Sequence, residues 1–77
     1  MKNSIKEEIG KTIKKIRLDH SDKIEELALK SGVATSTLSR YENGKNMKIE
    51  TLEKILKPYN VELDIFFEEI VAKMQQN

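Results

Sequence analysis

The sequence contains no cysteine and no tryptophan, and it has only one proline among its 77 residues. Without cysteine there is neither a disulfide framework nor a thiolate metal site, which fits a reducing compartment such as the cytoplasm. No apolar run approaches the roughly 20 residues that a membrane-spanning helix needs. The first residues also lack the apolar stretch of a secretory signal peptide. We therefore expect a small cytoplasmic protein.

Net charge is also low, at +1, so bulk basicity does not indicate a polyanionic partner. The charges are unevenly distributed, however. Residues 1–61 carry 13 Lys and Arg against 9 Asp and Glu, a balance of +4, whereas residues 62–77 carry one Lys against four acids, a balance of −3. A cationic body with an acidic end can place its basic side on a polyanion.

Apolar residues recur at spacings of three and four throughout the chain, which is the pattern of amphipathic helices, and no segment alternates as a strand does. We predict five helices, at about 5–18, 23–31, 35–42, 49–57 and 62–76. The fold class is therefore all-α, with one compact five-helix domain over residues 1–77. A helix, a short turn containing glycine and a second helix, at about 24–43, form a helix-turn-helix.

Capping and stop signals support these boundaries. Ser4 and Asp22 each precede a glutamate by three residues, which is typical of a capping box at a helix start. Gly32 and Asn60 are suited to the left-handed conformation that ends a helix. Gly10 lies inside the first predicted helix, where glycine costs up to about 1 kcal/mol relative to alanine. We expect a close packing contact at Gly10.

The stretch "GVATSTLSRYENGK" (residues 32–45) replaces good helix formers with small hydroxyl residues around one arginine. On a helical wheel, Leu38 and Tyr41 share one side, while Ser36, Arg40 and Asn43 lie opposite. Short side chains allow a helix to approach a surface closely. Arginine binds guanine O6 and N7 bidentately, and Ser or Thr contacts base edges, as a major-groove helix requires.

A simpler interpretation exists for the start of this helix. Thr35, Ser36 and Thr37 are residue types that are common in N-terminal capping regions. Taken alone, the three residues fit either interpretation equally well.

The surrounding sequence resembles the Cro/phage-repressor type of helix-turn-helix regulators, which includes lambda-repressor-like domains. The similar stretches are "IGKTIKKIR", "IEELALKSGVATSTLSRYENGK" and "IETLEKILKPYNVEL". The length, "KKIRL", "NMKIETLEKI" and "DIFFEEI" are especially similar to the small dimeric controller proteins of restriction–modification systems. This resemblance implies a sequence-specific, double-stranded DNA-binding transcriptional regulator without a cofactor.

The resemblance also implies roles for individual positions. An internal ion pair joins Arg17 and Glu42. The positions that match base contacts are Thr35, Ser36, Ser39 and Arg40. The positions that match phosphate contacts are Thr37, Asn43 and Lys45, and Lys23 is a further candidate because Ile24 replaces the usual phosphate-binding glutamine. Ala34 replaces the usual serine N-cap, so Thr35 is a candidate for that cap, and Met47 replaces the usual proline before the fourth helix.

The last predicted helix has an apolar arc of about 140°, which is broader than the roughly 100° of an ordinary surface helix. Leu63 and Phe67 are assigned to the core. A broad apolar surface usually marks an interface, so the remaining residues are assigned to a homodimer interface: Phe66, Ile70, Val71 and Met74. A two-fold dimer sets two recognition helices about 34 Å apart and predicts a palindromic operator.

No residue pattern indicates an enzyme or a metal site. His20 is the only histidine, and it lies in a polar turn without an accompanying nucleophile. The adjacent pairs Glu25–Glu26 and Glu68–Glu69 each splay by about 100° on a helix and form no carboxylate dyad. The competing hypothesis is an antitoxin-type or phage-type interaction protein, whose last helix holds a protein partner such as a toxin.

Overall fold

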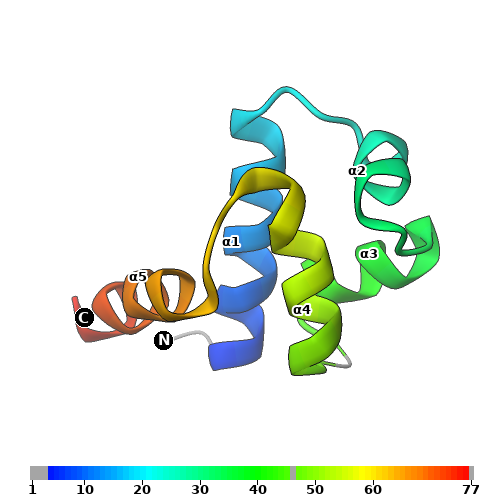
Figure 1. The fold of residues 1–77 in the computed structure, drawn as a ribbon. Helices are drawn as coiled ribbons and strands as arrows, with labels where there is room; N and C mark the ends of the chain where they lie inside the picture. The colour runs from blue at the N-terminus through cyan, green and yellow to red at the C-terminus, as the bar shows by residue number, and fades with distance from the viewer. Residues whose placement is uncertain (1–3, 46, 77) are drawn as a thin grey trace.

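The computed structural model describes residues 4–45 and 47–76, and these form helices joined by short loops (Figure 1). The helices are α1 (Ile5–Asp19), α2 (Ile24–Ser31), α3 (Thr35–Glu42), α4 (Ile49–Leu56) and α5 (Leu63–Gln75), and a 3-10 turn, η1 (Lys57–Tyr59), follows α4. No strand occurs within the described ranges. The predicted all-α class and helix-turn-helix order are confirmed, whereas the predicted domain ends, residues 1–3 and 77, lie outside the described residues.

The long first helix lies in the middle of the molecule, with α2 and α3 on one side and α5 on the other (Figure 1). Its inner face packs against the other helices in one continuous apolar core. Fully buried residues from every α-helix contribute to this core: Ile13, Leu27, Leu38, Leu52, Ile55, Leu56, Phe66 and Ile70. The apolar positions predicted from the sequence spacing therefore form one shared core.

Helix starts and ends follow local chemistry. Ser4 and Glu7 form the predicted capping box of α1, because each side chain accepts a hydrogen bond from the other's backbone N–H. Gly32 (φ 73°) and Asn60 (φ 56°) have the predicted left-handed conformation after α2 and η1. A Cβ built on Gly10 would lie 2.5 Å from the carbonyl oxygen of Glu42, so α1 approaches the end of α3 at backbone distance, as expected.

The predicted start of α2 is displaced by one residue. Lys23 is the N-cap residue, and its backbone N–H donates to the carboxylate of Glu26 at 2.8 Å. Asp22 does not cap the helix, because its side chain is turned into the protein. There it accepts hydrogen bonds from the ammonium of Lys30 and the hydroxyl of Tyr59.

The assignment of two residues to a dimer interface is wrong. Phe66 is 1% exposed and Ile70 is 0% exposed, so both lie in the core of the single chain and have no surface for a partner. Phe67 and Leu63, which the sequence assigns to the core, are half-buried and pack against it, and Val71 is 46% exposed. The apolar arc of about 140° on this helix contains both buried and exposed positions. A helical wheel therefore could not distinguish Phe66 and Ile70, which are buried, from their neighbours Phe67 and Val71.

Candidate nucleic-acid interface

The third helix is held by its inner face. Leu38 and Tyr41 are buried, and Val33 is buried in the turn that leads into the helix. The hydroxyl of Tyr41 accepts a hydrogen bond from the backbone N–H of Lys48 at 3.0 Å, which ties the end of α3 to the start of α4. These contacts fix which side of α3 faces outward.

The outward face carries the residues predicted to read bases. Thr35, Ser36, Ser39 and Arg40 are all exposed. Within residues 4–45 and 47–76, none of these four side chains makes a hydrogen bond or an ion pair. Their hydroxyl and guanidinium groups therefore remain available to a ligand.

The start of α3 has no side-chain cap. Ala34 is the N-cap residue, in extended conformation, and Thr35 is already the first helical residue. The expectation that Thr35 replaces the missing cap is therefore wrong, because its hydroxyl lies beyond the capping position. The alternative that these hydroxyl residues serve only to cap the helix loses its support for the same reason.

The candidate phosphate contacts differ in their availability. Lys23 and Lys45 are exposed, one before α2 and the other after α3. Thr37 is half-buried on α3. Asn43 is exposed, but its amide nitrogen donates to the carbonyl oxygen of Ser39 at 2.8 Å. The same carbonyl also accepts from the backbone N–H of Asn43 at 3.1 Å, and the oxygen of the Asn43 amide makes no hydrogen bond within the described residues.

An ion pair fixes the end of α3 to α1. Arg17 Nε and Nη2 donate to the two carboxylate oxygens of Glu42 at 2.7 and 3.0 Å, and Nη1 donates to the carbonyl oxygen of Asp22 at 2.9 Å. The hydrogen bonds to Glu42 raise the pKa of the Arg17 guanidinium further above its ordinary value, so the pair stays charged. One buried side chain thereby links α1, the start of α2 and α3.

A second polar cluster was not predicted. Asp22 accepts from Lys30 Nζ at 2.8 Å and from the Tyr59 hydroxyl at 2.8 Å. The hydrogen bond from Lys30, followed by that from Tyr59, lowers the pKa of Asp22, and burial raises the pKa of Tyr59. The His20 ring lies against Tyr59, with the ring centroids 4.4 Å apart. This cluster fastens the α1–α2 turn to η1.

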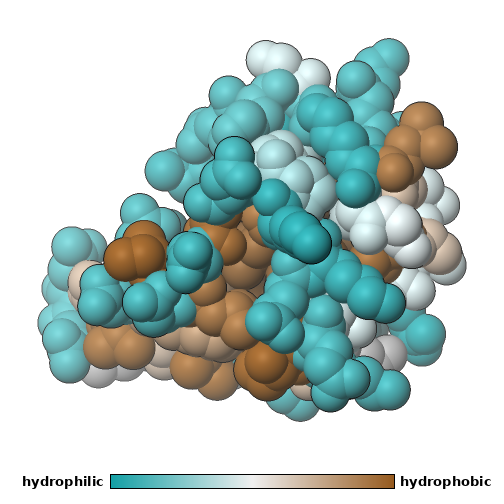
Figure 2. Space-filling view, viewed as in Figure 1, coloured by the Kyte–Doolittle hydropathy of each residue, from teal (hydrophilic) through white to brown (hydrophobic). Residues whose placement is uncertain are grey.

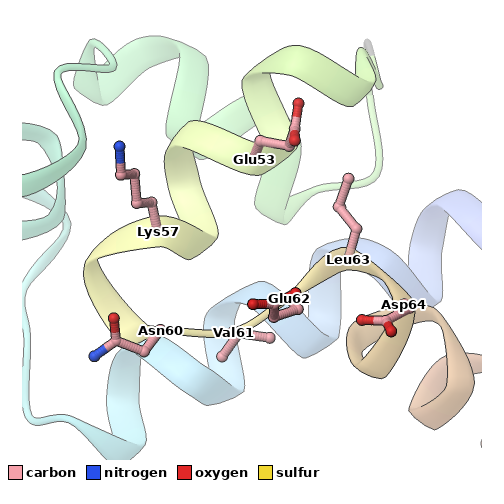
Figure 3. A pocket seen from close by; sticks show the side chains of 7 residues that line it. All are labelled: Glu53, Lys57, Asn60, Val61, Glu62, Leu63 and Asp64. Carbon is pink, nitrogen blue, oxygen red and sulfur yellow. The ribbon is translucent and has the colours of Figure 1, made fainter.

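The molecule also has a hollow between α4 and the start of α5 (Figure 3). Leu63 extends from α5 toward α4, and Glu53 lies above it in this view. The lining mixes apolar and charged groups without a convergent set of ligands. Within the described ranges, no three His, Asp or Glu side chains are placed to hold a metal ion. None of the helices in these ranges is long and apolar enough to span a membrane.

An apolar band crosses the surface from α5 toward α4 (Figure 2). Exposed apolar residues of these helices include Ile49, Ile65 and Val71, and half-buried ones include Leu63, Phe67 and Met74. Phe67 and Val71 also line a shallow apolar groove along α5. This surface is separate from the outward face of α3.

Comparisons with known proteins agree with this geometry. The family model described as "Helix-turn-helix" matches residues 13–66. The restriction–modification controller protein C.Esp1396I is similar at 32% identity, with a TM-score of 0.83, over 97% of this chain and 99% of that one.

A further structure, of the C.Esp1396I tetramer with its natural 35-base-pair operator, gives 32% identity and a TM-score of 0.83 over 95% and 97% of the two chains. The clp gene regulator ClgR from C. glutamicum has the same fold, at 24% identity and a TM-score of 0.83, over 96% of each chain. No curated protein sequence matches the chain.

Proposed function

Because this chain belongs to the helix-turn-helix family, we propose that it is a transcriptional regulator that binds double-stranded DNA with α3 in the major groove. One observation carries the proposal. The outward face of α3 has four exposed polar side chains without partners in the described structure, whereas the inner face is held by buried apolar residues. A helix of this kind is built to present hydrogen-bonding groups to an external surface.

We assign base reading to Thr35, Ser36, Ser39 and Arg40. Arg40 is the only cation on the outward face of α3, and its guanidinium is suited to a bidentate contact with guanine O6 and N7. The neighbouring hydroxyl groups both donate and accept, which suits base edges.

Phosphate contacts are assigned to the residues that flank this face: Lys23, Thr37, Asn43 and Lys45. Lys23 and Lys45 supply positive charge whose contribution to affinity falls with salt. The Arg17–Glu42 pair does not touch DNA in this account. It holds α3 at a fixed angle to the rest of the domain.

The protein acts as a homodimer in this proposal. Val71 and Met74 keep the interface role predicted from the sequence, and Phe67 and Leu63, on the same face of α5, take the place of Phe66 and Ile70. The apolar band of Figure 2 supports this surface, because large exposed apolar patches usually mark interfaces. A two-fold axis there places two α3 helices on two half-sites of a palindrome.

We propose control of a restriction–modification system as the biological role, with DNA in the cytoplasm as the site of action. The support is the similarity, at 32% identity over nearly the whole chain, to a restriction–modification controller protein that has been crystallised as a tetramer on its operator. The chain acts by binding and not by catalysis in this proposal. Its one histidine lies against Tyr59, and the Nδ1 atom of this histidine lies 2.8 Å from the carbonyl oxygen of Ile16.

Selection of binding sites from a random double-stranded DNA pool, at two salt concentrations, tests this function. We expect a palindromic motif with half-sites about ten base pairs apart, recovered at both salt concentrations. Binding that is indifferent to sequence and disappears with salt would contradict the proposal. The apolar surface of α5, and a protein partner for it, would then explain the chain better.

A further inference from the structure

A shallow hollow lies where α2 meets the start of α3. Its lining is mostly apolar and comes from Ala28, Leu29, Val33 and Ala34, together with Glu25 and Thr35. Leu29 is 87% exposed, which is the largest exposed fraction among the exposed large apolar residues of the described chain. Apolar atoms project among weakly polar side chains over α2 and α3 in Figure 2.

The lining excludes some ligands. No lysine or arginine contributes to the hollow, and the carboxylate of Glu25 is its only charged group. A phosphate would be repelled by this carboxylate and would find no cation. The hollow therefore suits an uncharged, apolar group.

The hollow is continuous with the base-reading face, because Thr35 belongs to both. A group in the hollow would therefore lie beside the base pairs that α3 reads. The C5-methyl group of thymine is the apolar group that B-DNA presents in the major groove, and alanine and the methyl group of threonine are suitable contacts for it.

We propose that Ala34 and the methyl group of Thr35 contact the C5-methyl group of one thymine in each half-site. This inference rests on the proposed function and names a specificity determinant within it. Ala34 is exposed and in extended conformation at the N-cap, where it makes no side-chain hydrogen bond. Ser, Thr, Asp and Asn are all better N-caps than alanine. Alanine therefore does little to stabilise the helix at this position, whereas its short apolar side chain is suited to contact with the ligand.

Single dT→dU replacements across the selected half-site test the contact, because uracil lacks only the methyl group. We expect one position at which binding weakens about fourfold, the effect of removing one buried methyl group. At that position, a 5-methylcytosine pair should bind more tightly than a cytosine pair by a similar factor. This second comparison separates the methyl group from the rest of thymine.

Two variants assign the effect to the hollow. Ala34→Gly and Thr35→Ser each remove one methyl group, and neither disturbs folding, because glycine is accepted at an N-cap and serine keeps the hydroxyl. In the double variant, the ratio of dT to dU affinity should fall to about one. Leu18→Ala, at an exposed leucine of α1 outside the hollow, should leave the ratio unchanged.

The outcomes are separable. Specific binding without any dT→dU effect, or with the same effect in the double variant, would overturn the methyl contact and leave the proposed function standing. A selected half-site without thymine would overturn it as well. Binding that is blind to sequence would overturn the proposed function and the contact together.

Discussion

On the outward face of α3, the side chains of Ser36, Ser39 and Arg40 make no hydrogen bond within the described residues. Arg17 makes three, to both carboxylate oxygens of Glu42 and to a backbone carbonyl. Both regions contain an arginine guanidinium. Where the fold needs a charge, the charge is buried and paired, and where the surface must bind a ligand, the polar groups are left exposed and unpaired.

The largest expected effect comes from breaking the buried pair. Glu42→Ala leaves the Arg17 guanidinium buried without its carboxylate, and loss of one partner of such a pair costs about 3–5 kcal/mol of unfolding free energy. Urea unfolding measures the change. Glu69→Ala, at an exposed glutamate of α5, is the matched control and should change stability by less than about 0.5 kcal/mol. An equal, small loss in both variants would contradict the role of the pair.

A smaller loss is expected at the closest approach of α1 and α3. In Gly10→Ala the added Cβ would lie 2.5 Å from the carbonyl oxygen of Glu42, so the two helices must separate. Overpacking of this kind costs about 1–3 kcal/mol. Thermal unfolding of this variant and of Lys11→Ala, exposed on the same helix, tests the prediction. A stabilised Gly10→Ala protein would mean that helix propensity outweighs the contact.

Arg40→Ala removes the one cation from the outward face of α3. We expect unfolding free energy to change by less than about 0.5 kcal/mol, while binding to the selected operator weakens by about 1–3 kcal/mol and specificity relaxes at one base pair. Arg40→Lys should rescue little, because lysine keeps the charge but not the bidentate fork. Equal weakening on operator and random DNA would identify Arg40 as a phosphate contact.

Low pH should reduce the free energy of unfolding that the Asp22 cluster contributes, and it should not change the outward face of α3. The hydrogen bonds from Lys30 and Tyr59 hold the pKa of Asp22 below its unfolded value of about 3.9. Asp22 therefore contributes stability above that pH, and the contribution is lost as pH falls through the folded pKa. Unfolding measured from neutral pH downward should show a flatter profile for Asp22→Asn than for the original protein. Parallel profiles would contradict this contribution.

The sequence predicted most of the fold because its signals are local. Spacings of three and four place the helices, and the left-handed stops at Gly32 and Asn60 follow from residue type. The failures came from contacts between distant segments. Asp22 was interpreted as a cap because its partner Tyr59 is 37 positions away. Phe66 was wrongly assigned to the interface because adjacent positions on one broad apolar arc differ only in what packs against them.

The outward face of α3 could also be predicted from the sequence, because the buried positions of Leu38 and Tyr41 determine which side chains point outward. Their separate roles in DNA binding were inferred from family resemblance and stay predictions. The hollow beside Ala34 was not visible, because α2 and α3 contribute to it jointly.

We propose that the residues on the outward face of α3 serve binding and do not stabilise the fold. A single variant with Thr35→Ala, Ser36→Ala, Ser39→Ala and Arg40→Ala tests it most directly, with Tm and operator affinity measured on the same preparation. We expect an unchanged or higher Tm, since alanine favours helix, together with loss of preference for the selected operator over a scrambled duplex. A lowered Tm with that preference retained would contradict it.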